Sequence, residues 1–154
     1  RGDVPQDTSW VLEANIDDLA PQFFGPLLQT LLDAGAQDAF LTPVVMKKGR
    51  PGIQVTVLCS PGRTEPLERI LFRETSTIGV RRHRVWRSCL DREIITVTTE
   101  FGDVRIKVSS GLDQEFNRMP AFEDCRARAR EHGVSTLQVH QAALAVACSM
   151  RGDR

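Results

Sequence analysis

Acidic and amide side chains are concentrated in residues 13–18, which read Glu-Ala-Asn-Ile-Asp-Asp. Side chains in a β-strand alternate between its two faces, so Glu13, Asn15 and Asp17 would share one face and Asp18 would begin the next turn. Carboxylate and amide oxygens are the hard ligands that magnesium and manganese prefer. The stretch therefore fits a divalent-metal site. Helix capping by Asp17 or Asp18 beside a solvated strand end would explain the same residues.

A second stretch is basic, with Lys47, Lys48 and Arg50 placed around Gly49. Glycine lets the backbone approach a ligand closely, and the three cations could neutralise phosphate charge. The pattern is not the phosphate loop of nucleoside triphosphatases, because G-x-x-x-x-G-K-[ST] is absent. The alternative interpretation is an ordinary exposed basic turn.

Hydroxyl groups form a third stretch, in which Thr75, Ser76 and Thr77 precede Arg81. The hydroxyls can donate hydrogen bonds to phosphate or ribose oxygens, and Arg81 adds a forked cation. A loop at the end of a helix, with local bonds between hydroxyl and backbone, is the alternative.

The residues that follow Arg81 are unusually basic, with Arg82, Arg84 and Arg87 on a predicted strand. Such a strand could bind nucleic acid, but it is more often an edge protected by charge or part of a subunit interface. Twenty basic residues balance twenty acidic ones. This balance argues against a general nucleic-acid binder, so we expect a homo-oligomer and no nucleic-acid partner.

The elements that must position these residues follow from the apolar pattern. The predicted strands are 10–16, 38–46, 53–59 and 78–90, and the predicted helices are 21–34 and a second one capped by Thr64. Pro26 should kink the first helix or delay its regular start. Pro43 implies an edge strand or a bulge. The order β-α-β-β-α-β is that of a ferredoxin-like unit.

The second half of the chain has a different pattern. Residues 94–99 and 104–108 alternate around Phe101-Gly102 and predict a β-hairpin. An irregular stretch after Gly111 and two helices, 120–131 and 136–150, complete the chain. The predicted fold is α+β: a ferredoxin-like βαββαβ half followed by a β-hairpin and two C-terminal helices. The predicted organisation is a flexible N-terminal segment, 1–9, a ferredoxin-like subdomain, 10–90, and a hairpin and helical subdomain, 91–154.

Composition limits the class of protein. The 154 residues suffice for one domain or two small ones. Four cysteines without a C-x-x-C pair argue against a zinc ribbon and favour a reducing compartment, so we expect a cytoplasmic protein. No apolar run approaches the roughly 20 residues of a membrane helix. The chain starts without methionine, and we expect it to be a fragment of a longer protein.

Five segments, in this order, resemble the C-terminal part of the LarC-type nickel insertion proteins, the nickel chelatases of the lactate racemase cofactor pathway. They are residues 12–18, 34–38, 41–52, 74–81 and, more weakly, 123–125. Together they run over most of the chain.

The resemblance implies a function that composition does not. Proteins of this family are lyase-class cyclometallases that insert nickel into pyridinium bisthiocarboxylic acid mononucleotide, forming one carbon–nickel and two sulfur–nickel bonds. They use CTP with manganese or magnesium and so build the nickel-pincer cofactor. The full-length proteins also have an N-terminal domain. We therefore expect this chain to bind CTP and a divalent cation without completing nickel insertion by itself.

With the resemblance, each stretch acquires an expected role. The expected phosphate ligands are Lys47, Lys48 and Arg50. The rest of the CTP site is expected to be Thr75, Ser76, Thr77 and Arg81. The expected metal ligands are Glu13, Asp17 and Asp18. The alternative is a ferredoxin-like regulatory or oligomerisation module with incidental nucleotide binding.

The sequence departs from the family pattern in three places. Ala14 replaces a commoner threonine, and Ala20 stands where a capping serine or threonine is usual, which should weaken that cap by about 1 kcal/mol. Residues 119–122 read Met-Pro-Ala-Phe where lysine and tyrosine are commoner, so the family role of this segment does not transfer directly.

Overall fold

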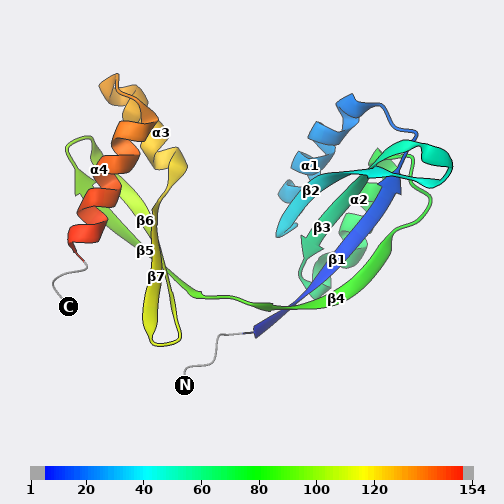
Figure 1. The fold of residues 1–154 in the computed structure, drawn as a ribbon, viewed down its shortest axis with the longest axis horizontal. Coiled ribbons are helices and arrows are strands. Elements are labelled where there is room, and N and C mark those ends of the chain that lie inside the picture. The colour runs from blue at the N-terminus through cyan, green and yellow to red at the C-terminus, as the bar shows by residue number, and fades with distance from the viewer. Residues whose placement is uncertain (1–5, 151–154) are drawn as a thin grey trace. The chain divides into compact units, whose positions relative to one another are not determined.

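The computed structural model describes residues 6–150. They form two compact units, Gln6–Arg87 and a second that begins at Ser88 (Figure 1). The sequence placed this boundary slightly later, between residues 90 and 91. Each unit has its own antiparallel sheet and its own pair of α-helices. The predicted α+β class is therefore confirmed.

The first unit has the predicted order of elements. Its strands are β1 (Gln6–Ile16), β2 (Asp38–Val45), β3 (Pro51–Cys59) and β4 (Arg81–Ser88), and its helices are α1 (Phe24–Asp33) and α2 (Thr64–Glu74). The strand order β2-β3-β1-β4 is the ferredoxin-like arrangement. The order leaves β2 at an edge of the sheet, which is the position that Pro43 predicted.

The core of the first unit lies between the sheet and both helices. Leu12, Ala14 and Ile16 of β1 are buried in it. They pack with buried leucines from both helices, among them Leu31 of α1 and Leu71 of α2. Since strand side chains alternate, burial of these three turns the polar residues of β1 to the opposite face of the sheet. That face carries Glu13 and Asn15, the first residues of the predicted metal-binding stretch.

The start and the end of α1 follow from single residues. A short 3-10 turn, Pro21–Phe23, precedes the helix, so Pro26 lies in the first regular turn, where its missing N–H is harmless. The delayed start is therefore confirmed. At the other end, Gly35 has a φ of +93°. Its N–H donates to the carbonyl of Leu32, and the N–H of Ala36 donates to that of Leu31, which satisfies the last helical carbonyls.

Two expectations at element boundaries were wrong. Thr64 is the first residue of α2 rather than its cap, and its hydroxyl donates to the carbonyl of Pro61. A 3-10 turn at Pro61–Arg63 takes the capping position. The first strand starts at Gln6, so residues 6–9 belong to β1 and not to a flexible segment. Ser9 is fully buried there. The rest of the predicted flexible segment, residues 1–5, lies outside the described residues.

The second unit is a three-stranded meander with two helices. Its elements are β5 (Asp91–Thr99), β6 (Gly102–Gly111), β7 (Gln114–Pro120), α3 (Phe122–His132) and α4 (Thr136–Ser149). The hairpin and both helices are confirmed, but the stretch predicted to be irregular is strand β7, paired with β6. Val104, Ile106, Val139 and Ala143 lie in the core of this unit.

No helix within residues 6–150 is both long enough and apolar enough to cross a membrane.

Candidate functional site

The carboxylates that follow β1 meet residues from two distant segments of the first unit. Arg50, in the connection between β2 and β3, places its Nη1 3.4 Å from Oδ2 of Asp17. Ser76, between α2 and β4, donates a hydrogen bond from its hydroxyl to Asp18. Figure 1 shows both connections at the end of the sheet where β1 finishes. The three predicted stretches therefore come together at this end.

A polar cavity of about 370 Å³ lies at this end of the sheet. Its lining combines two carboxylates, an amide, two hydroxyls and a guanidinium. The lining residues are Asn15, Asp17, Asp18, Ser76, Thr77, Ile78, Gly79 and Arg81. Five of the ten residues predicted for the site border this cavity, so the acidic and hydroxyl stretches share one space.

Arg81 joins β4 to the polar face of β1. Its Nη2 donates to Oδ1 of Asn15 at 2.9 Å and lies 3.6 Å from Oε2 of Glu13. Glu13 also accepts a hydrogen bond from the amide of Gln54. Glu13 does not line the cavity. Its role in the structure is to position the side chains of Arg81 and Gln54. Sequence reasoning missed Gln54, although its alternation with buried Val55 and the antiparallel pairing of β1 with β3 bring it opposite Asn15.

The basic turn presents two lysines to solvent. Lys47 and Lys48 are exposed, and neither side chain makes an ion pair or hydrogen bond with another residue between 6 and 150. Lys48 has a φ of 63° and Gly49 a φ of 70°. A left-handed conformation is uncommon for lysine and costs of the order of 1 kcal/mol. The turn is closed by a hydrogen bond of 2.8 Å from the N–H of Met46 to the carbonyl of Arg50.

The hydroxyl groups of residues 75–77 make local bonds to the backbone or border the polar cavity. Thr75 donates to the carbonyl of Leu71 at 2.6 Å and accepts from the N–H of Thr77 at 3.1 Å, so its hydroxyl ends helix α2. The hydroxyl of Thr77 bonds to the carbonyl of Gly79. The local interpretation thus describes the hydroxyls of Thr75 and Thr77, although Ser76 and Thr77 also border the cavity.

The three predicted metal ligands do not form one cluster. Glu13, Asp17 and Asp18 each have a different partner, and no three His, Cys, Asp or Glu side chains within residues 6–150 are grouped to hold a metal. Asp17 and Asp18 nevertheless border the same cavity with the amide of Asn15. This oxygen set fits a magnesium or manganese ion that keeps several waters and takes its other ligands from phosphates.

Two further features adjoin the site. An apolar hollow of about 370 Å³ shares Asp17 with the polar cavity and is lined mainly by aliphatic side chains and Phe24. Two further arginines of β4 are paired within their own unit: Arg82 lies 3.6 Å from Glu68, and Arg87 lies 2.8 Å from Asp7. Arg84 instead lies over the ring of Trp86, which is 70% exposed.

Comparison with known proteins identifies the family. The model of a family described as nickel insertion proteins matches residues 1–140. The chain belongs to the nickel insertion protein family. A member from Gloeobacter violaceus, provisionally named a nickel insertion protein, is 52% identical over 134 residues, which are 87% of this chain and 32% of that protein. The chain spans about a third of the length of such relatives.

Two other relatives are informative. The pyridinium-3,5-bisthiocarboxylic acid mononucleotide nickel insertion protein of a Thermotoga species is 36% identical over 143 residues, which are 93% of this chain and 36% of that protein. The solved structure of LarC2 in its apo form, the C-terminal domain of a cyclometallase involved in synthesis of the NPN cofactor of lactate racemase, is 38% identical with a TM-score of 0.88. That match covers 93% of this chain and 99% of LarC2. A protein of Methanopyrus kandleri, 22% identical with a TM-score of 0.61, shares the fold.

Proposed function

We propose that the Gln6–Arg87 unit binds CTP together with manganese or magnesium at the cavity beside Asp17 and Asp18. The main observation behind this proposal is that two carboxylates, two hydroxyls and the guanidinium of Arg81 line the same cavity. A cation held by the carboxylates would offset their repulsion of a triphosphate. CTP itself is proposed from the family resemblance, since the cavity alone fits any nucleoside triphosphate.

Two arginine side chains are available to bind the phosphates of CTP. The side chain of Arg50 is 61% exposed and that of Arg81 is 55% exposed, and their ion pairs with Asp17 and Glu13 are long. Exposed ion pairs of this kind contribute about 0–1 kcal/mol, so a phosphate can replace the carboxylate at little cost. The hydroxyls of Ser76 and Thr77 donate to Asp18 and to the carbonyl of Gly79, so each would exchange that bond for one to a phosphate. The exposed ammonium groups of Lys47 and Lys48 lie in the same turn as Arg50.

The metal and the phosphates are expected to bind together. When Arg50 turns to a phosphate, Asp17 loses its partner and becomes available to the cation. Asp18, Asp17 and Asn15 supply oxygen ligands, and Glu13 keeps Arg81 in place. The apolar hollow on the other side of Asp17 offers the nucleobase a surface away from water. Because phosphate binding by Arg50 frees Asp17 for the cation, CTP and the cation are expected to increase each other's affinity for the protein.

In the full-length protein we assign this unit to nickel insertion. The names of the relatives identify pyridinium-3,5-bisthiocarboxylic acid mononucleotide as the molecule that receives nickel. We propose the same substrate here, with nickel as the inserted metal and lyase-class cyclometallation as the reaction. CTP binding by this chain would be one part of that activity.

Titration calorimetry tests the nucleotide proposal. We expect binding heat when CTP is added with manganese and at least tenfold weaker binding when the metal is chelated. UTP and ATP serve as matched ligands for base preference. Absence of CTP heat in both conditions would contradict the proposal. Equal affinity for CTP with and without manganese would show that the nucleotide binds without the metal.

A homo-oligomer is also proposed, because the strand order leaves β4 at an edge with Trp86 exposed. An exposed edge strand can pair with a second copy. Light scattering of the chain with and without CTP would test this, and a strict monomer in both conditions would contradict it. A module whose only role is assembly would remain oligomeric while failing to bind CTP.

A further inference from the structure

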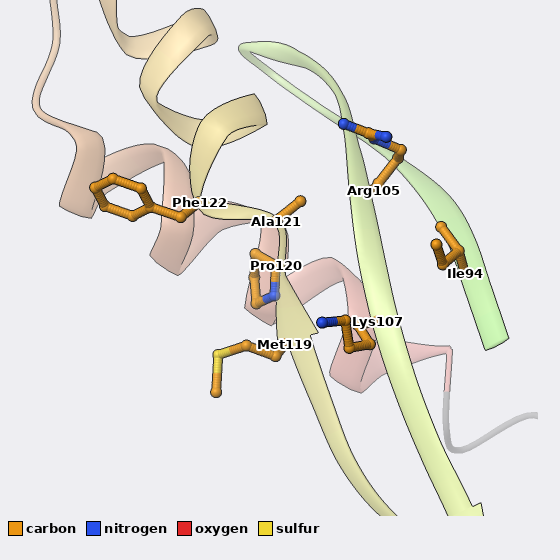
Figure 2. A pocket seen from close by; sticks show the side chains of 7 residues that line it. All are labelled: Ile94, Arg105, Lys107, Met119, Pro120, Ala121 and Phe122. Atoms are coloured by element: carbon orange, nitrogen blue, oxygen red, sulfur yellow. The ribbon is translucent and has the colours of Figure 1, made fainter. Parts of the chain in front are cut away.

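The second unit contains a hollow that the nucleotide proposal does not use. Val104, Ile106 and Val108 of β6 are buried under the helices, so Arg105 and Lys107 face the opposite side of the sheet. A cavity of about 250 Å³ lies on that side (Figure 2). Its lining residues are Ile94, Arg105, Lys107, Met119, Pro120, Ala121 and Phe122.

Large apolar side chains border this hollow without being buried. Ile94 is 65% exposed, Met119 48% and Phe122 62%. Apolar area left in water costs roughly 25 cal/mol per Å², so three such side chains at one hollow favour a ligand that covers them.

The frame of the hollow is fixed. Asp124, in the first turn of α3, accepts three bonds from Arg105, at 3.0 Å from the backbone N–H, 2.8 Å from Nε and 2.7 Å from Nη2. The N–H of Ala121 donates to the carbonyl of Arg105 at 2.8 Å. These bonds tie the start of α3 to β6, so the walls on both sides of the hollow are held before any ligand arrives.

Lys107 supplies the available charge. Its ammonium has no ion-pair or hydrogen-bond partner among residues 6–150, whereas Arg105 is engaged by Asp124. Figure 2 shows the Lys107 side chain extending from β6 toward the Pro120 segment. A cation beside apolar and aromatic walls suits a flat ring that carries an acid group.

We propose that this hollow binds the acid-substituted pyridinium ring of the mononucleotide that receives nickel, with Lys107 against one acid group and Phe122 against the ring. The proposal rests on the proposed function, which supplies that substrate. The volume is below the roughly 300–1,000 Å³ of pockets that bury drug-sized ligands, so it fits one substituted ring rather than a whole nucleotide. A cationic ring over the Phe122 face adds a cation–π attraction.

Nicotinate mononucleotide is the probe, because it carries a pyridinium ring, a carboxylate and a phosphate. Backbone NMR of the isotope-labelled chain would follow its titration. We expect saturable shifts confined to residues that line the hollow. Lys107→Gln and Phe122→Ala should each weaken binding about fivefold to tenfold. The matched controls are Arg130→Gln, which removes one exposed cation, and Leu137→Ala, since Leu137 is 63% exposed. Both should stay within about twofold.

The same spectra separate this inference from the nucleotide proposal. CTP with magnesium, which is diamagnetic, should shift the signals of Asp18 and Ser76 whether or not the probe binds. Probe shifts at Asp18 and Ser76 alone, or no probe shifts, would overturn the ring site and leave CTP binding standing. Shifts at the hollow that depend on protein concentration without probe would assign it to a second copy and also overturn the proposal.

Discussion

Ser76 donates a hydrogen bond to the carboxylate of Asp18, although 58 positions separate them in the sequence. The bond ties the segment between α2 and β4 to the end of β1. It places a hydroxyl and a carboxylate side by side on one cavity. The carboxylate can hold a cation, and the hydroxyl, once released from Asp18, can donate to a phosphate.

Asp18→Asn should weaken CTP binding in manganese at least about tenfold, or about 1.4 kcal/mol. Asparagine keeps the size of the side chain and an oxygen to accept from Ser76, but it loses the charge that attracts the cation. Calorimetry measures the effect. Asp33→Asn, on α1 and bonded to Gln29, is the control and should leave affinity unchanged. Equal affinities for the two variants would remove Asp18 from the metal site.

Arg81→Lys should lower CTP affinity while changing stability little. Lysine keeps the charge but lacks the fork that reaches Asn15 and Glu13 together. Because Arg81 is half exposed, its loss should change the free energy of unfolding by less than about 1 kcal/mol. Denaturant unfolding and calorimetry on the same preparation separate the two effects. A large loss of stability with normal affinity would make Arg81 a purely structural residue.

Gly35→Ala and Gly25→Ala should change stability in opposite directions. Gly35 has a φ of +93°, where a Cβ costs about 1–2 kcal/mol, so its substitution should lower the melting temperature. Gly25 lies inside α1 with no atom within 4 Å of an added Cβ. Alanine there should stabilise by about 0.4–1 kcal/mol. Thermal unfolding compares both variants with the parent, and the same direction of change for both would contradict this account of the helix end.

Asp124 should make the second unit sensitive to acid. Hydrogen bonding by Arg105 lowers the pKa of Asp124 from 3.8 to about 2. A depressed pKa in the folded state adds stability that is fully present above the unfolded value, and it is lost as pH falls from about 4 to about 2. Asp124→Asn should remove that part of the acid dependence, as followed by unfolding at pH 5 and pH 2.5. Glu123→Gln, beside it and largely exposed, should retain it.

Most elements could be predicted because apolar residues in them follow the strand or helix period. Strand β7 could not be predicted in this way, because one of its core-facing positions is occupied by a charged residue. The side chain of Arg118 is only 10% exposed, paired with Glu115 at 2.7 Å, and donates to the carbonyl of Ala147. A buried arginine satisfied in this way hides the alternation that identifies a strand.

Several residues that border the polar cavity could be picked out from the sequence, but their pairings could not. Asp17 and Asp18 follow directly from the end of a strand, and Ser76 and Thr77 from a loop rich in hydroxyls. Which cation meets which carboxylate depends on the strand register and on the path of two connections. Arg50 was expected to hold phosphate, and its contact with Asp17 could not be foreseen. Thr75 was expected in the site, and its hydroxyl bonds to the end of α2.

The most direct test of a metal–nucleotide site is a crystal of this chain soaked with CTP and manganese chloride, with data collected at the manganese edge. We predict an anomalous peak within coordination distance of Asp17 or Asp18 and of CTP phosphate oxygens, with Arg81 and Ser76 contacting those phosphates. A manganese peak away from both aspartates, or CTP bound at another surface, would contradict the account.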